Sequence, residues 1–466
     1  MLAAAIVCYL LGTMALGAWA SRWVKTSGDF MLAGRQLPLF LSASALFATW
    51  FGSETIFGAS SEYLEHGLLG VIEDPFGGAL CLFLFGLFFA KPIYAMKART
   101  LGDVYLMLFG KRVALFASIF MIPAYFGFIA AQLVAFGLIL GAVADTSLEI
   151  GILISAAVVL FYTFLGGMWA ISITDFVQTI VIVVGLLWLA VTLSQEAGGV
   201  SSILQKAPSA SFTFFPEQTL SAWMEYIGAW AILGLGSIPS QDIYQRSMAA
   251  KNSKIARKSL FLAAGFYLTV GLLPLFIALS AVVLYPAGSP ENPQMLLPDL
   301  VMKHSSLPLQ IVFFGALLSA IMSTTSSSML APAALLTENI IKPLKTTSSW
   351  SEKQLLRVLR VCLAGITLVS VLLAFWKTNI YSLIGEASML LLVSLLVPLT
   401  AGLYWRKASP TGANGSLFAG MIAYLLFYSE LVYMPVPHHL AALLISAAAM
   451  VAGSLAYPKT AHENVS

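Results

Sequence analysis

Residues 318–342 read LSAIMSTTSSSMLAPAALLTENIIK, in which six consecutive hydroxyl side chains interrupt an apolar helix-forming stretch. Hydrocarbon offers no hydrogen-bond partners, so such a run is costly in a lipid-facing helix unless every hydroxyl is satisfied within the protein. The residues that share one helical face, about 100° wide, are Ala320, Ser323, Thr324 and Ser327. Hydroxyls and a carbonyl on one face can bind a small hard cation. They can equally bond back to their own helix or join two helices, so this stretch alone leaves both roles open.

The composition places the chain in a membrane. Of 466 residues, 59% are hydrophobic and only 10% are charged, whereas soluble domains carry about 25% charged residues. The three cysteines lie in apolar runs without metal-binding or disulfide spacing. The first apolar run, 2–21, has no basic segment before it and is long enough to span a bilayer, so we expect a retained helix rather than a cleaved signal.

Apolar windows of about 20 residues predict an all-α membrane protein with about 13 transmembrane helices. The candidate spans are 2–21, 38–61, 68–95, 113–143, 147–165, 172–194, 221–246, 258–285, 308–341, 356–376, 380–404, 411–430 and 438–457. No loop between them is long enough for a soluble domain.

The distribution of basic residues predicts the orientation. With the N-terminus outside and the C-terminus in the cytoplasm, only Lys206, Lys303 and Lys377 of the 24 Lys and Arg residues face outward. The cytoplasmic set includes Arg246, at the end of the seventh span. Positive charge gathers on the cytoplasmic side of membrane proteins, so this bias supports the span count and a multi-pass protein of a cell membrane, which we take to be a bacterial inner or plasma membrane.

The second span contains small and polar residues that favour an unwound helix in mid-membrane. Gly52 and Gly58 flank Glu54 and Thr55. Unwound backbone exposes carbonyls to a cation and amides to an anion. Close packing of small residues against another helix is the alternative explanation.

Two further acids lie inside candidate spans. Asp74 precedes Pro75 and two glycines at the start of the third span, and Asp175 enters the sixth span after the turn at 166–167. Each can cap a helix N-terminus. Alternatively, Asp74 lines a cavity and Asp175 supplies the anionic ligand of the hydroxyl run, since intramembrane acids are commonly functional.

A second interruption predicts the architecture. Gly234, Gly236 and Pro239 break the seventh span, five spans after the break near 52–58. Two inverted five-helix repeats place their discontinuous first helices at this separation.

At this point the chain resembles the sodium:solute symporter family, which includes transporters of proline, pantothenate, sugars, sialic acid and choline. The resemblance runs from about Asp29 to Tyr404 and is carried by FMLAGRQLP (30–38), GGMWAISITDFVQ (166–178), SAIMSTTSSSML (319–330) and LTENIIK (336–342). It implies a single transmembrane transporter domain over 1–466 with a leucine-transporter-type core. Its two five-helix repeats would be 38–194 and 221–404, with one helix, 2–21, before them and two peripheral helices in 411–457.

The resemblance also implies where sodium binds. The main site maps onto the carbonyls of Ala48, Phe51 and Ala320 and the hydroxyls of Ser323 and Thr324. A second sodium site, found in some members, maps onto Asp175, Ser323, Ser326 and Ser327. Two sodium ions per cycle is therefore a hypothesis, and Thr325 and Ser328 remain as helix-packing hydroxyls.

The substrate is less sharply predicted. GLFFAKPIYAMK (86–97) and SIPSQDIYQR (237–246) resemble the choline-transporting branch, and Trp50 matches one aromatic of its cation cage. The other cage positions are Gly78, Phe128 and Ser240, where that branch has Tyr and Trp, which argues against choline itself. The remaining cavity candidates are Glu54, Thr55, Asp74 and Gln241. The acids favour an amino acid or related amine, while an organic acid such as pantothenate stays open and a sugar is less favoured.

Other functional classes have less support from the sequence. All five histidines lie in loops or at span ends, where none can activate a buried nucleophile, so we expect no enzyme. A nutrient sensor would need a signalling domain, and none is predicted. Proton coupling through Glu54 or Asp175 is the closest rival to sodium coupling. The expected partners are a small organic solute, sodium ions and the lipid bilayer, with no nucleic acid and no obligatory protein partner.

Overall fold

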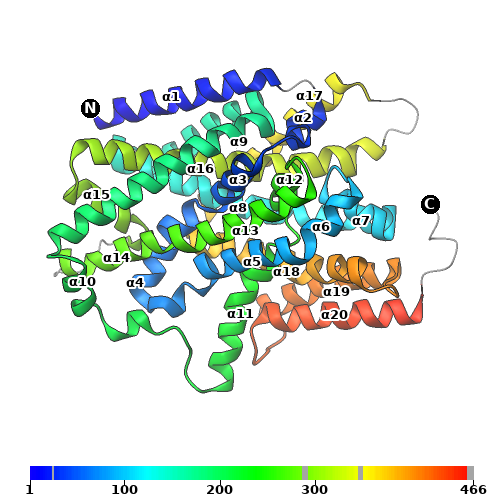
Figure 1. Ribbon diagram of the computed structural model, residues 1–466. Helices are drawn as coiled ribbons and strands as arrows, with labels where there is room; N and C mark the ends of the chain where they lie inside the picture. The colour runs from blue at the N-terminus through cyan, green and yellow to red at the C-terminus, as the bar shows by residue number, and fades with distance from the viewer. Residues whose placement is uncertain (24–25, 286–291, 345–349, 459–466) are drawn as a thin grey trace.

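The computed structural model describes residues 1–23, 26–285, 292–344 and 350–458. Within these ranges every regular element is helical, and the only β-type pairing is an isolated bridge between Leu37 and Ala250. Figure 1 shows long helices that run roughly along one direction, with α1 (Leu2–Ala20) along one edge and α19 (Pro410–Tyr428) and α20 (His438–Ala456) along the opposite edge. The predicted all-α class is confirmed.

The helices of the first half run to Lys206. They are α2 (Ser27–Leu32), α3 (Leu39–Trp50), α4 (Ala59–Gly70), α5 (Gly78–Leu84), α6 (Ala90–Met96), α7 (Leu101–Phe109), α8 (Lys111–Ala144), α9 (Leu148–Glu196) and α10 (Val200–Lys206). Wider π-helical turns at Glu54–Gly58, Ile72–Gly77 and Phe85–Phe89 join several of them.

The helices of the second half begin at Leu220. They are α11 (Leu220–Gly236), α12 (Gln241–Met248), α13 (Ser253–Val270), α14 (Leu272–Leu284), α15 (Leu296–His304), α16 (Leu307–Leu335), α17 (Glu352–Trp376), α18 (Ile380–Tyr404), α19 and α20. A π-helical turn, Leu336–Ile341, extends α16.

Nine helical segments in the described ranges are long and apolar enough to cross a membrane. Each coincides with one of the predicted spans. The four remaining predictions, 38–61, 147–165, 221–246 and 411–430, also fall on helices, but three of these helices are interrupted. Breaks separate α3 from α4 and α11 from α12, and Gly167 adopts φ 52°, ψ −157° inside α9, where it divides that helix in two.

Polar side chains at the helix starts explain several boundaries. Thr100 and Asp103 form a reciprocal capping box at α7, and Ser351 and Gln354 form one at α17. Each pair satisfies backbone N–H groups that have no partner within the helix. These helices therefore begin where the sequence supplies a cap.

The hydroxyl run lies at the centre of the protein. Helix α16 packs against α8 and α9 and also contacts α3 and α12. Every residue of α16 from Phe313 to Leu335 is buried. The hydroxyls therefore lie inside the protein, and the cost of exposing them to lipid does not arise.

Candidate functional site

The break after α3 frees main-chain groups beside the centre of α16. Helix α3 ends at Trp50, and Phe51 leaves helical geometry with ψ 81°. The carbonyl of Trp50 accepts a bond of 3.3 Å from the Tyr267 hydroxyl, and the amide of Ser53 donates to Gln132 Oε1 over 3.2 Å. Carbonyls at a helix end lack partners within the helix and are free to bind other groups.

Thr324 meets this break directly. Its hydroxyl donates a 2.8 Å hydrogen bond to the carbonyl oxygen of Ala48. A Cβ placed on Gly52 would lie only 3.1 Å from Thr324 Oγ1, so the missing side chain permits the close approach of α3 and α16. Ala320 lies one turn before Thr324, and Phe51 lies at the break; both are fully buried. The structure thus brings two residues predicted for the main sodium site, Thr324 and Ala48, into direct contact, whereas the Ser323 hydroxyl is directed to Asp175 on α9.

The other hydroxyls of the run take different directions. Thr325, Ser326 and Ser327 donate to the carbonyls four residues earlier, over 2.5, 2.7 and 2.7 Å. This bonding is the packing behaviour expected of Thr325. Ser328 differs from its expected packing role, because it lines a cavity beside Thr324.

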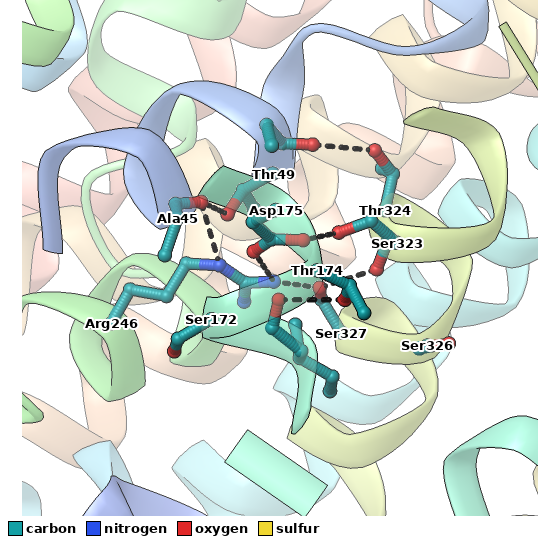
Figure 2. Close-up of polar contacts among 12 residues, drawn as sticks. Ala45, Thr49, Ser172, Thr174, Asp175, Arg246, Ser323, Thr324, Ser326 and Ser327 are labelled. Atoms are coloured by element: carbon teal, nitrogen blue, oxygen red, sulfur yellow. Dashed lines mark hydrogen bonds and ion pairs between the residues drawn. The ribbon is translucent and has the colours of Figure 1, made fainter. Parts of the chain in front are cut away.

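Asp175 lies in the middle of the buried core. It follows the break at Gly167 by two helical turns, so it is not at the start of a helix and does not cap one. Its Oδ1 accepts a hydrogen bond from the Ser323 hydroxyl, and its Oδ2 lies 4.0 Å from Nη2 of Arg246 (Figure 2). Ser327 reaches this group through Arg246, whose Nη2 donates to the Ser327 hydroxyl. Ser326 points away from Asp175 in Figure 2.

Arg246 corrects the charge-based topology in one respect. The charge distribution predicts Arg246, at the end of the seventh span, on the cytoplasmic side, but its side chain is 0% exposed. It lies on α12, directly after the break in the seventh span, and its Nε donates to the carbonyl of Ala45 over 3.0 Å. Counting charges by segment cannot distinguish a loop arginine from one that folds back into the core.

A small cavity, with a volume of about 40 Å³, lies next to the Thr324–Ala48 contact. Its lining residues are Thr49, Trp50, Glu54, Phe128, Gln132, Leu233, Ser237, Ser240, Asp242, Thr324, Ser328 and Ile384. They include two carboxylates and two aromatic rings, while none of the described lining residues is Lys, Arg or His.

Four of the predicted substrate residues, Trp50, Glu54, Phe128 and Ser240, line this cavity. The other four are buried but are not among its lining residues. The Tyr267 hydroxyl contacts Asp74 Oδ1 and lies 2.8 Å from the Thr55 hydroxyl. Gly78 packs against the rings of Trp50 and Tyr267, and Gln241 accepts a 2.6 Å bond from the amide of Leu101.

Sequence reasoning missed Asp242, Tyr267 and Gln132. Asp242 follows the second helix break by two residues, so its place beside a predicted break was an available signal. Its Oδ1 accepts a 3.0 Å bond from Tyr125. Tyr267 and Gln132 sit in uninterrupted helices, where an isolated polar residue gives no sign of which neighbour it meets.

The fold has solved counterparts among transporters. A substrate-bound, outward-open Na⁺-coupled sialic acid symporter superposes with a TM-score of 0.83 at 19% identity, covering 98% of both chains. The crystal structure of MhsT in complex with L-phenylalanine superposes with a TM-score of 0.57 at 16% identity, covering 90% of this chain and 98% of that one. At these identities the likeness defines the fold, that of the leucine-transporter-type membrane transporters.

The chain belongs to the sodium:solute symporter family, whose model matches residues 30–423. The human high affinity choline transporter 1 is 28% identical over 93% of this chain and 79% of its own length. The sodium/glucose cotransporter of Vibrio parahaemolyticus is 26% identical, over 92% and 84%. The sodium/pantothenate symporter of Escherichia coli K12 is 24% identical, over 96% and 95%. The predicted family is confirmed, and with it the class of transporter.

Proposed function

We propose that this protein is a sodium-coupled symporter that imports a small solute carrying a positively charged amino group, by alternating access. The observation that carries this proposal is the cavity between the two broken helices. It holds the carboxylates of Glu54 and Asp242 and the rings of Trp50 and Phe128, and Thr324 forms part of its wall.

Sodium coupling rests on the junction of α3 and α16. Hydroxyl and carbonyl oxygens are suitable ligands for a hard cation, and Thr324 and Ala48 present one of each within 2.8 Å. Phe51, Ala320 and Ser323 complete the proposed main site. Because Thr324 belongs to both this site and the cavity wall, sodium binding and solute binding would stabilise the same arrangement of α3 against α16.

An amine fits the cavity better than an anion. A carboxylate such as Glu54 attracts an ammonium group, and the faces of Trp50 and Phe128 attract the same charge through cation–π interaction. An anionic solute would face these acids without a basic partner among the described lining residues. The human relative, by its name, transports the quaternary amine choline. We propose either a simple amine or the amino group of an amino acid.

The number of membrane crossings, the repeats and the orientation are part of the same proposal. We infer thirteen crossings, with the inverted repeats at 38–194 and 221–404 and peripheral helices at 2–21 and in 411–457. The opposite ends at which α1 begins and α20 finishes in Figure 1 support an odd number of crossings. We propose that the N-terminus faces outward in a bacterial inner or plasma membrane.

Purified protein tests the proposal directly. The melting temperature should be higher in sodium chloride than in potassium chloride. It should rise again when the transported solute is added, because a ligand of the folded state stabilises that state by mass action. The solute panel contains quaternary amines, primary amines, amino acids, pantothenate and glucose. Stabilisation by pantothenate or glucose alone would contradict the amine assignment.

Uptake into proteoliposomes then identifies the coupling ion. An imposed sodium gradient should drive accumulation of the stabilising solute, while an imposed proton gradient without sodium should not. Accumulation driven by protons alone would mean that the symporter is coupled to protons, carried by a titrating carboxylate, and not to sodium. Glu54 would be the first candidate, because its Oε1 has no hydrogen-bond partner in the described part of the chain.

A further inference from the structure

Arg246 is a permanent positive charge at the centre of four helices. Its side chain is fully buried and comes from α12. Its Nε donates to the Ala45 carbonyl of α3 over 3.0 Å, and its Nη2 reaches the Ser327 hydroxyl of α16. The same Nη2 lies 4.0 Å from Oδ2 of Asp175 on α9 (Figure 2). One guanidinium therefore contacts a carbonyl, a hydroxyl and a carboxylate.

These oxygens are the kind that would bind a sodium ion. Ser327 and Asp175 both belong to the residue set onto which the second sodium site maps. A hard cation prefers carboxylate, hydroxyl and carbonyl ligands, and the guanidinium takes one of each. A guanidinium stays protonated at any physiological pH, so its charge is always present.

The hydroxyls around Asp175 are already used as donors, while Asp175 Oδ2 accepts no hydrogen bond within the described residues and faces the guanidinium 4.0 Å away. The Ser323 hydroxyl donates to Asp175 Oδ1, and the Ser327 hydroxyl donates to the Ser323 carbonyl over 2.7 Å while it accepts from Arg246. The Ser326 hydroxyl is directed to the Met322 carbonyl, 2.7 Å away. A mobile cation at Asp175 would also lie close to the guanidinium, and like charges repel strongly where water is excluded.

We propose that Arg246 is the resident cation of the Asp175 site, so that this symporter binds one sodium ion per cycle, at the main site, instead of two. The inference rests on the proposed sodium coupling. In chemical terms, the tethered guanidinium compensates the negative charge of Asp175. It also holds α9 and α16 against α3 and α12. Removal of the guanidinium should convert the same carboxylate and hydroxyls into a true second sodium site.

Equilibrium binding of radioactive sodium to the purified protein counts the ions. Wild type should bind one per chain, Arg246→Met should bind two, and Arg246→Lys, which keeps a charge, should bind one. The double variant Arg246→Met/Asp175→Asn should return to one, because the carboxylate that attracts the second ion is gone. The slope of melting temperature against the logarithm of sodium concentration should roughly double in Arg246→Met alone.

Two results would overturn the proposal. One is a wild type that binds two ions and loses one on Asp175→Asn. The other is a folded Arg246→Met protein that still binds one. If Arg246→Met does not fold, wild type and Asp175→Asn decide the matter: one ion in both supports the proposal, and a drop from two to one ends it. Absence of any sodium binding in wild type would instead contradict the proposed function itself.

Discussion

The hydroxyl of Thr324 donates a 2.8 Å hydrogen bond to the carbonyl of Ala48, a residue 276 positions earlier in the chain. The contact joins the centre of α16 to the last turn of α3, beside the point where α3 breaks. It also lies at the wall of the cavity that contains Glu54 and Asp242. An ion bound at this contact would therefore affect the shape of the cavity, which is the simplest physical basis for coupling an ion to a solute.

Thr324→Ala should weaken the activation of uptake by sodium at least about tenfold, because an interaction with a charged group contributes about 1.5–3 kcal/mol and each 1.4 kcal/mol is a factor of ten. The measurement is the sodium concentration for half-maximal uptake. Thr325→Ala is the matched control, since that neighbouring hydroxyl bonds only to the Ile321 carbonyl of its own helix. Equal effects of the two changes would mean that the helix matters for packing and not for the ion.

Gly52→Ala should impair sodium binding without unfolding the protein. The added Cβ would lie 3.1 Å from both Thr324 Oγ1 and Gln132 Oε1, so it would displace Thr324, which we place at the sodium site. Sodium-dependent stabilisation should shrink in thermal unfolding. Gly265→Ala is the control, because a Cβ there meets nothing within 4 Å and alanine favours a helix over glycine. Unchanged sodium affinity in Gly52→Ala would show that the ion does not bind at this junction.

Glu54→Gln should reduce the affinity for an amine solute by at least about tenfold while it leaves an uncharged analogue less affected, because it removes one attractive charge from the cavity. Asp242→Asn should act in the same direction. Binding is measured by solute-induced stabilisation at saturating sodium. Glu217→Gln serves as the control, since Glu217 is exposed and does not line the cavity. A gain of amine affinity in Glu54→Gln would refute the charge argument.

Tyr267→Phe should lower stability by about 1–3 kcal/mol, because it leaves buried polar partners without a donor. The lost hydroxyl contacts Asp74, lies 2.8 Å from the Thr55 hydroxyl and donates to the Trp50 carbonyl over 3.3 Å. The check is the melting temperature in the absence of solute. Tyr433→Phe provides the comparison, since Tyr433 is 87% exposed and should tolerate the change. A loss no larger than that of Tyr433→Phe would show that this network does not stabilise the fold.

The sequence was most informative where a pattern repeats or where a charged residue lies inside an apolar run. Apolar windows predicted the helices closely, because the bilayer imposes the same length and hydrophobicity on every crossing. Gly and Pro clusters located both helix breaks, since these residues interrupt the backbone regardless of their neighbours. Acids inside apolar runs marked Glu54, which lines the cavity, and Asp175, which lies in the core.

The hydrogen-bond partners of individual side chains were harder to predict from the sequence. Ser323, Thr324, Ser326 and Ser327 are chemically alike and close together, yet three of them contact other helices and Ser326 bonds only to its own. Their directions depend on the rotation of α16 against α3 and α9, which a helical wheel does not specify. The sequence did not predict the positions of Asp242 and Tyr267 at the site for the same reason.

The sequence alone thus determined an all-helical membrane protein, its two helix breaks and its family, because these follow from local composition and from motifs. Only the tertiary structure decided which oxygens meet. It turned Thr324 toward Ala48 and placed Arg246 beside Asp175, although the count of basic residues predicts that arginine among the cytoplasmic charges. A buried charge must find its partner across the folded core, and that pairing depends on distances between helices that no local stretch of sequence encodes.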